Sequence, residues 1–186
     1  CYQECFAEIL PDIQPGDMEI IGHSVDFLAV NVYDGRFITA KRDEKGAVIG
    51  AEYLERPWGT ATSTMGCCIT PESIYYVSKF LYEEYRLPVY ISENGIALAD
   101  FLFSDGKVHD PARSEYLRLY IDALERAQKD GIEIDGYFYW SFLDNFECSL
   151  GYTQRYGLVY VDFENGNRTP KDSFYEYKKI IAASRS

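Results

Sequence analysis

Three stretches of the chain are largely apolar and rich in β-branched and aromatic residues, a composition typical of buried strands. They lie near residues 24–33, 88–93 and 134–143. The second stretch ends in Glu93, and the Asn-Gly that follows at once favours a turn. The pattern therefore predicts three strands, one of which delivers a carboxylate to its own C-terminal end.

Three other segments carry apolar residues at helical spacing, near residues 70–85, 110–130 and 169–183. Each begins with a polar residue followed by proline. Thr and Asp are favoured N-caps, and proline in the first helical position loses no intrahelical hydrogen bond. The three helices are predicted to start at Thr70-Pro71, Asp110-Pro111 and Thr169-Pro170.

Two further segments complete the pattern. Residues 34–69 show no clear period and are expected to form a long loop, whereas residues 156–162 and the Glu-Asn-Gly-Asn after them predict a strand and a tight turn. Strands that alternate with helices predict a parallel sheet.

Three βα units do not close a barrel, which needs eight, but long loops after strand ends resemble barrel-type active-site loops. We therefore expect residues 1–186 to be a single partial α/β domain, the C-terminal part (about three βα units) of a TIM (β/α)8 barrel, incomplete as given. A small open sheet is the alternative.

Composition narrows the functional classes. The net charge is −12 without any Lys/Arg cluster, so no nucleic-acid partner is expected. No apolar run approaches the roughly 20 residues that span a membrane. The five cysteines include no CxxC pair and only two His are present, so no metal site is expected. Reduced thiols in a cytoplasmic protein are the favoured interpretation, although a disulfide stays open.

The predicted strand ends carry polar and aromatic side chains. The first delivers Asn31 and Tyr33, the second Glu93, and the third Trp140, with Glu147 in the loop beyond. Because the carboxyl ends of parallel strands meet at one edge of a sheet, these side chains are expected to lie together. A carboxylate nucleophile, a phenol beside it, an indole platform and an acceptor carboxylate are the parts of a sugar site.

Five segments in order resemble the family 1 glycoside hydrolases. Ser92-Glu93-Asn94-Gly95 matches the family's nucleophile motif, and residues 140–147 resemble its Trp-Ser-x-x-Asp-Asn-Phe-Glu segment. Asn31-Val32-Tyr33, residues 155–162 and residues 168–171 resemble other family segments. The resemblance covers about residues 20–183 and implies a retaining β-glycosidase, β-glucosidase-like, that needs no cofactor.

The resemblance also implies a role for each site residue. Glu93 would attack the anomeric carbon, and Tyr33 would support it by a hydrogen bond. Asn31 would meet the sugar near its 2-hydroxyl, Trp140 would stack on the ring, and Glu147 would accept bonds from the distal hydroxyls. Tyr156 would line the same pocket. Structural roles are the alternatives: a turn carboxylate for Glu93, a buried Tyr33, a strand-end Asn31, a core Trp140, a surface Glu147 and a plain strand residue for Tyr156.

The chain departs from the family pattern at three places. Cys148 stands where members usually carry a second sugar-binding Trp, and Cys67 stands where a Trp usually lines the leaving-group site. The Asn-Glu-Pro motif that carries the family's acid/base carboxylate does not occur. Both carboxyls of a retaining enzyme are needed, about 5 Å apart.

We therefore expect the isolated chain to be inactive, with exposed barrel edges that a homo-oligomer could cover. Glu147 stands where the phospho-sugar branch of the family carries Ser, which favours a non-phosphorylated substrate such as a β-glucoside. The alternative function is a non-catalytic carbohydrate-binding or assembly module derived from the same barrel.

Overall fold

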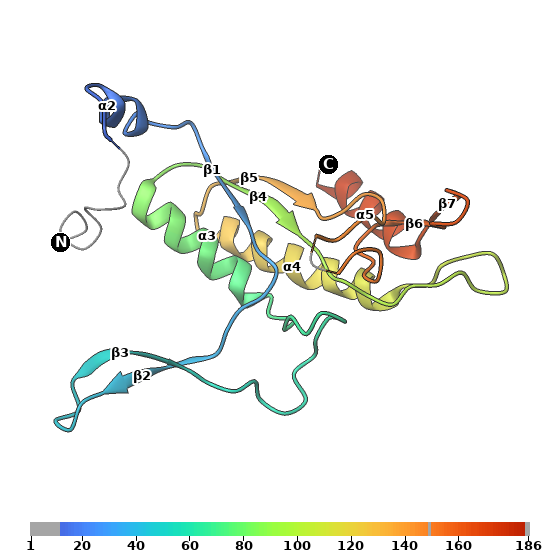
Figure 1. The fold of residues 1–186 in the computed structure, drawn as a ribbon, viewed down its shortest axis with the longest axis horizontal. Coiled ribbons are helices and arrows are strands. Elements are labelled where there is room, and N and C mark those ends of the chain that lie inside the picture. Colours follow the sequence, from blue (N-terminus) through green and yellow to red (C-terminus); the bar gives the residue numbers. More distant parts are fainter. Residues whose placement is uncertain (1–11, 149, 185–186) are drawn as a thin grey trace.

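The structure is a computed structural model that describes residues 12–148 and 150–184. Cys1 and Cys5 lie outside these residues. Figure 1 shows a central sheet with helices beside it, and an N-terminal helix and a hairpin that extend away from it. The helices are α2 (Asp17–Ile21), α3 (Glu72–Tyr85), α4 (Pro111–Lys129) and α5 (Asp172–Ala183). The strands are β1 (Leu28–Asn31), β2 (Ile38–Arg42), β3 (Val48–Tyr53), β4 (Val89–Asn94), β5 (Ile134–Tyr139), β6 (Val159–Val161) and β7 (Arg168–Pro170).

The central sheet is parallel and has the order β1-β4-β5, so β4 lies in the middle. The register places Val30 of β1 opposite Ile91 of β4, and Ile91 opposite Tyr137 of β5. The fold is thus mixed α/β, and the strands of the described residues do not close into a barrel. Their carboxyl ends point the same way, which sets the place of the candidate site.

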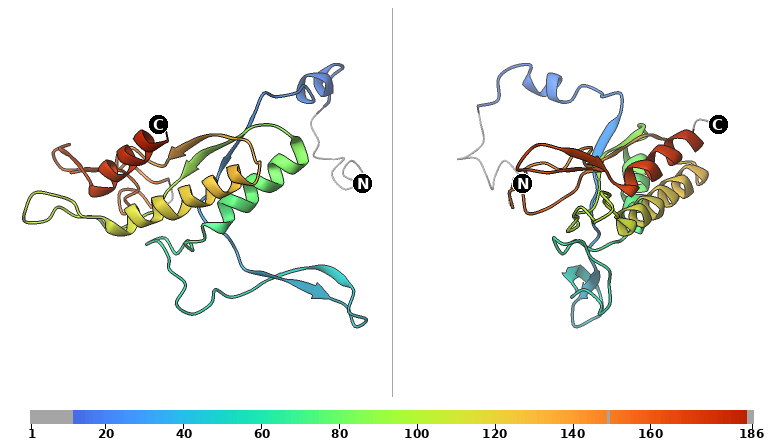
Figure 2. Two further views of the ribbon diagram at one scale, coloured as in Figure 1. Left: turned by 180° about the vertical axis from the view of Figure 1, so that it is seen from behind. Right: turned by 90° about the vertical axis from the view of Figure 1, so that its right-hand side faces the viewer.

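The hydrophobic core lies between this sheet and the helices α3 and α4. Val89 and Ile91 of β4 are fully buried there, together with Ile74 of α3 and Tyr120 of α4. Figure 2 shows the helices on one side of the sheet. The opposite side of the sheet carries Tyr90 and Ser92, which alternate with the buried residues of β4 and are only partly covered. One face of the sheet is therefore packed and the other is open.

The structure changes several predicted limits. The first strand covers only Leu28–Asn31 of the predicted 24–33, because residues 24–27 are exposed and pair with no described strand. The third ends at Tyr139 rather than residue 143, since Ser141 beyond it exchanges backbone hydrogen bonds with Tyr156 and Leu158 instead of continuing along β4.

The prediction of a long loop at residues 34–69 is wrong in part, because β2 and β3 form an antiparallel hairpin inside it. Every residue of both strands is exposed, so no alternation of apolar and polar positions marked them in the sequence. The predicted strand at 156–162 is reduced to Val159–Val161, which pairs with β7 across the predicted turn.

Two predicted helix starts also move. Residues Thr169-Pro170 belong to β7, and α5 begins at Asp172. Thr70 does not cap α3, which begins at Glu72, because its hydroxyl accepts the backbone N–H of Gly35. The predicted start at Asp110 agrees with the N-cap position of α4, although the Asp110 carboxylate accepts from Ser173 and from the Arg113 side chain rather than from a backbone N–H of the helix.

Candidate active site

Tyr33 and Glu93 form the centre of the candidate site. The Tyr33 hydroxyl donates to Oε2 of Glu93 at 2.6 Å. The pairing of β1 with β4 explains the contact, since the register sets Asn31 opposite Glu93 and the chain carries Tyr33 just past the end of β1. Burial, and then the hydrogen bond to Glu93, raise the pKa of Tyr33 above its ordinary value. Tyr33 therefore stays protonated and acts as a donor to the carboxylate.

Asn31 lies beside this pair on the open face of the sheet. Ser92 donates its hydroxyl to Oδ1 of Asn31 at 2.7 Å, which fixes the side-chain amide on the neighbouring strand. Asn31 is exposed at the strand end. With its oxygen occupied by Ser92, its amide nitrogen is the group left to donate to a ligand next to Glu93.

Asn94 holds the end of β4 in place. Its side chain is fully buried, and its amide nitrogen donates to the backbone oxygen of Val32 at 2.7 Å and to the Tyr116 hydroxyl at 2.8 Å. The Tyr137 hydroxyl donates to its oxygen at 2.7 Å. Asn94 thus ties β4 to β1, α4 and β5, so the residue after Glu93 has a structural role.

Gly95 is required by the approach of the loop that follows β5. A Cβ at this position would lie 1.9 Å from the backbone oxygen of Trp140, which leaves no room for a side chain. The Trp140 N–H donates to the backbone oxygen of Asn94 at 2.9 Å, which brings this loop against the end of β4. Asn94 and Gly95 therefore shape the strand end that presents the Glu93 carboxylate.

Tyr156 adjoins Tyr33 from another loop, and Cys67 and Glu147 are electrostatic neighbours of Tyr156. The ring of Tyr156 lies edge-on to that of Tyr33, with 6.0 Å between centroids. Burial, and then the neighbouring Cys67 and Glu147, raise the pKa of Tyr156 to about 12. After burial and Glu93, the negative charges of Tyr156 and Glu147 also raise the pKa of Tyr33.

Met65 joins the loop of residues 61–69 to the site. The Tyr156 hydroxyl donates to Sδ of Met65 at 3.0 Å. The same loop is held by Thr64, whose N–H donates to the backbone oxygen of Ala97 at 3.1 Å. Met65 could not be predicted as a site residue, because a thioether carries no sequence motif of its own.

A buried network of charges supports the loop that carries Trp140, Glu147 and Tyr156. Lys171 is fully buried, and its Nζ lies 2.6 Å from Oδ2 of Asp100 and 2.8 Å from Oδ1 of Asp144. Arg155 Nη1 lies 2.6 Å from the other oxygen of Asp144. Asp144 also accepts the N–H of Gly157 at 2.9 Å. The Asp144 carboxylate, near the start of this loop, therefore binds Arg155 and Gly157 near its end.

The network continues into α4 through Arg113, which is fully buried. Its guanidinium lies 2.7 Å from Asp100 and pairs with Asp110 at the start of the helix. Burial alone would raise the pKa of Asp100, but the charges of Arg113 and Lys171 hold it below its ordinary value. Sequence reasoning missed Arg113 and Asp100; their only signal was an Arg one turn after the Asp-Pro helix start.

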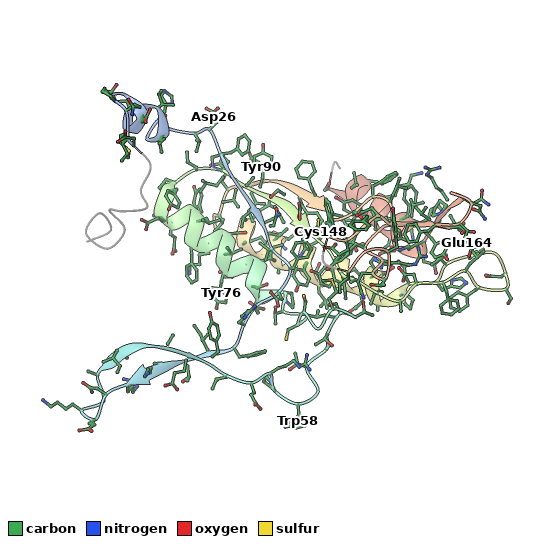
Figure 3. All side chains as sticks on the ribbon, viewed as in Figure 1. Asp26, Trp58, Tyr76, Tyr90, Cys148 and Glu164 are labelled. Carbon is green, nitrogen blue, oxygen red and sulfur yellow. The ribbon has the colours of Figure 1, made fainter. Side chains whose placement is uncertain are left out.

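The predicted site residues Trp140 and Cys148 differ in burial. Trp140 is half-buried beside Gly95, whereas Cys148, labelled in Figure 3, is exposed. Across residues 12–148 and 150–184, no group of three or more His, Cys, Asp and Glu side chains is arranged to hold a metal ion. Within the same ranges, none of the helices has the length and apolar character needed to cross a membrane.

Comparisons with a family model, with curated relatives and with solved structures point to one family of glycosidases. The sequence model of glycosyl hydrolase family 1 matches residues 2–186. A 1,4-beta-D-glucan glucohydrolase of Thermotoga neapolitana is 42% identical over 175 residues, which are 94% of this chain and 38% of the relative. An aryl-phospho-beta-D-glucosidase of Bacillus subtilis is 36% identical over 181 residues, 90% of this chain and 38% of the relative.

Solved structures agree with these sequences. The family 1 β-glucosidase from Thermotoga maritima superposes with a TM-score of 0.82 at 38% identity, over 97% of this chain and 39% of that one. The same enzyme is described in complex with glucoimidazole and with deoxynojirimycin. This chain thus spans about two fifths of the length of the relatives that it matches. The chain belongs to glycosyl hydrolase family 1.

Proposed function

We propose that this chain is the nucleophile-bearing C-terminal portion of a retaining β-glycosidase, and that it is inactive without the rest of the barrel. The observation that carries the proposal is the hydrogen bond of 2.6 Å from Tyr33 to Glu93 at the carboxyl ends of two adjacent parallel strands. A turn carboxylate without a catalytic role would have no need of a half-buried phenol donor.

The chemistry assigns one half of a two-carboxylate reaction to Glu93. Its carboxylate attacks the anomeric carbon as the bond from that carbon to the leaving oxygen breaks, and a second carboxylic acid gives the leaving oxygen its proton. Water then attacks the glycosyl ester, and the second group takes the proton back. Asn-Glu-Pro does not occur in the chain, so the proton donor belongs to a part of the barrel outside it.

The sheet supports the view that the chain is part of a (β/α)8 barrel. Three parallel strands of eight are about 38% of the strands of such a barrel. The chain covers 38% and 39% of the lengths of its sequence and structural relatives. The proposed site also lies at the carboxyl ends of the strands, where barrels of this type carry their active sites.

A non-phosphorylated β-glucoside is the substrate that the site favours. The charge of Glu147 acts on both Tyr33 and Tyr156, and a carboxylate in this neighbourhood would repel the charge of a sugar 6-phosphate. The relatives include both a glucan glucohydrolase and a phospho-β-glucosidase, and in our proposal Glu147 sets this chain with the first of these. The Thermotoga maritima enzyme is described in complex with glucoimidazole and also with a galacto-hydroximolactam, so its named ligands support a glycoside without selecting the sugar.

The test compares the isolated chain with a chimera. In the chimera, the part of the Thermotoga maritima β-glucosidase that this chain does not match is joined to it in frame. Turnover of an aryl β-glucoside is expected from the chimera, not from the isolated chain and not from the chimera with Glu93→Gln. A phosphorylated aryl glucoside is expected to react poorly, and to gain on the plain one in Glu147→Ser. Robust turnover by the isolated chain would refute the proposal.

A further inference from the structure

Tyr33 lies just past the end of β1, where strand pairing no longer fixes the backbone. The residue before it, Val32, still donates its N–H to the backbone oxygen of Glu93 at 2.8 Å. The Tyr33 hydroxyl must reach Oε2 of Glu93 at 2.6 Å, and the geometry of that contact depends on where the Tyr33 backbone is held. Contacts that hold this backbone therefore act on the Glu93 carboxylate.

Two buried tyrosines of α4 hold the backbone oxygen of Tyr33. Tyr116 and Tyr120 lie one helical turn apart, and their rings stack with 4.1 Å between centroids. Each donates its hydroxyl to the Tyr33 oxygen at 3.4 Å. Burial raises the pKa of both hydroxyls above the ordinary value of a tyrosine. Both therefore stay protonated and remain able to donate.

The same two hydroxyls also accept hydrogen bonds, so each one bridges two groups. Asn94 donates its amide nitrogen to the Tyr116 hydroxyl at 2.8 Å. Thr70 donates its backbone N–H to the Tyr120 hydroxyl at 3.0 Å. The two lone pairs of the Tyr33 oxygen are thus matched by two donors. Phenylalanine would fill this core without the cost of burying a hydroxyl, so the hydroxyls indicate a role beyond packing.

Tyr120 also holds a second segment that contacts the Tyr33 ring. Thr70, which donates to Tyr120, ends the loop that carries Met65. Met65 accepts the Tyr156 hydroxyl at 3.0 Å, and the Tyr156 ring lies edge-on to that of Tyr33. The Tyr120 hydroxyl therefore joins the backbone of Tyr33 to the loop whose contacts reach the ring of Tyr33 from the other side.

We propose that Tyr120 and Tyr116 are positioning residues of the reaction, because they hold the Tyr33 backbone where its phenol meets the Glu93 carboxylate. The inference rests on the proposed function, since it takes Glu93 as the nucleophile. Both rings belong to the core between the sheet and the helices, so they act on the nucleophile through Tyr33 rather than by contact with the sugar. Hydrogen bonds of 3.4 Å are long, so each hydroxyl alone has a modest effect.

Removal of the Tyr120 hydroxyl in the chimera tests this role. Tyr120→Phe keeps the stacked ring, and kcat for an aryl β-glucoside is expected to fall by about 3- to 10-fold. KM is expected to stay within about twofold of the parent value, because the buried hydroxyl does not meet the substrate. An unchanged kcat, or a loss that appears in KM alone, would overturn the proposal.

Tyr177→Phe is the matched control for the loss of a tyrosine hydroxyl. Tyr177 is a half-buried residue of α5 that donates to a strand carbonyl, the backbone oxygen of Tyr137, at 3.3 Å. The chemistry of this contact is the same as that of Tyr120 with Tyr33, but it lies away from the Tyr33 backbone. The control is expected to keep the kcat of the parent. An equal loss of kcat in the two variants would overturn the proposal.

A double-mutant cycle separates positioning from a general loss of stability. If Tyr120 acts through the Tyr33 phenol, kcat of Tyr33→Phe/Tyr120→Phe is expected to lie within about twofold of that of Tyr33→Phe. If Tyr120 acts on the fold in general, the two losses multiply, and that result overturns the proposal. Tyr116→Phe runs the same cycle from the second hydroxyl, so the test does not depend on the folding of one variant.

NMR of this chain without the rest of the chimera gives a readout that needs no turnover. The chemical shift of a tyrosine ζ-carbon depends on the hydrogen bond that its hydroxyl makes. In a chain labelled with ζ-¹³C tyrosine, the Tyr33 signal is the one lost in Tyr33→Phe, and Glu93→Gln gives its position without the carboxylate. Tyr120→Phe is expected to move the Tyr33 signal toward that position, whereas Tyr177→Phe is expected to leave it in place.

The two readouts keep this inference apart from the proposed function. A Tyr33 signal that stays in place in Tyr120→Phe overturns the positioning role, whether or not the chimera is active. A signal that moves, together with a folded parent chimera that gives no turnover, supports the hold on Tyr33 and counts against the proposed function. A signal that moves together with the expected loss of kcat supports both.

Discussion

Replacement of Lys171 by Met tests whether the buried charges hold the active-site loop. Lys171 is fully buried and joins Asp100 at 2.6 Å to Asp144 at 2.8 Å. Met has a similar length without charge, so Lys171→Met removes the cation and leaves the packing largely intact. The loop that carries Glu147 and Tyr156 is expected to lose one of its two cationic anchors, and the fold to lose stability.

The size of the effect follows from the partners that remain. Removal of one partner of a buried ion pair costs about 3–5 kcal/mol. Asp100 keeps Arg113 at 2.7 Å and Asp144 keeps Arg155 at 2.6 Å, so the lower value is expected. A loss of about 3 kcal/mol lowers the melting temperature of a chain of this size by about 6–12 °C, at about 2–4 °C for each kcal/mol.

Urea unfolding followed by far-UV circular dichroism measures this loss. Lys179→Met is the matched control, because the Lys179 side chain is 75% exposed and its ion pair is the surface contact with Glu176 at 3.5 Å. The control is expected to change the free energy of unfolding by less than about 1 kcal/mol. If Lys171→Met loses no more than Lys179→Met, the network does not stabilise the fold and the reasoning fails.

The pH dependence of the same variant gives a second check. The charges of Arg113 and Lys171 outweigh burial and lower the pKa of Asp100. A lowered pKa in the folded state contributes stability that is present above the unfolded pKa of about 3.9 and is lost as the pH falls through the folded value. The deficit of Lys171→Met is therefore expected to be full near pH 7 and to shrink below about pH 4. A deficit that grows on acidification contradicts this account.

Three further changes have defined outcomes. Gly95→Ala places a Cβ 1.9 Å from the Trp140 oxygen, so we expect a loss of about 1–3 kcal/mol in urea unfolding. Tyr33→Phe removes the donor to Glu93, and kcat of the chimera is expected to fall by about 10- to 100-fold. Asp172, and then Asp105, raise the pKa of His109. Its stabilisation is therefore present below the unfolded pKa of about 6.5 and lost as the pH rises through the folded value, so His109→Gln should destabilise at about pH 5 more than at about pH 10.

Each of these has a result that would count against it. An unchanged unfolding curve for Gly95→Ala would mean that the Trp140 loop can move away without cost. A Tyr33→Phe chimera with full kcat would show that the phenol is not needed by the nucleophile. An equal effect of His109→Gln at both pH values would show that the Asp105–His109–Asp172 contact does not depend on the charge of the imidazole.

The centre of the site was predictable from the sequence because its chemistry lies at strand ends. Glu93, Tyr33 and Asn31 follow apolar runs that could be recognised as strands, and parallel pairing brings such ends together. Their catalytic and sugar-binding roles, with those of Trp140 and Glu147, stay predictions. The parallel order of the strands was predictable for the same reason, since strands alternate with helices along the chain.

The supporting contacts were not predictable, because they join residues far apart in sequence. Lys171 and Asp100 are 71 residues apart, and no local pattern shows that a lysine will be fully buried. The β2–β3 hairpin was not predicted for a different reason. Both faces of its strands are exposed, so the alternation of apolar and polar residues by which strands are recognised is absent. The start of α3 differs from the predicted one because the Thr70 hydroxyl, predicted to cap the helix, accepts the N–H of Gly35 from a distant loop.

The most direct test of the central claim is chemical rescue of the chimera with Glu93→Gly. The shortened side chain leaves space on the face of the sugar from which the carboxylate attacks. With an activated aryl β-glucoside, turnover is expected to be lost and then restored by added azide, whose nitrogen bonds to the anomeric carbon as the aryl oxide departs. The account predicts an α-glucosyl azide as the product. Unaltered hydrolysis by Glu93→Gly, or a β-glucosyl azide, would contradict the assignment of Glu93 as the nucleophile.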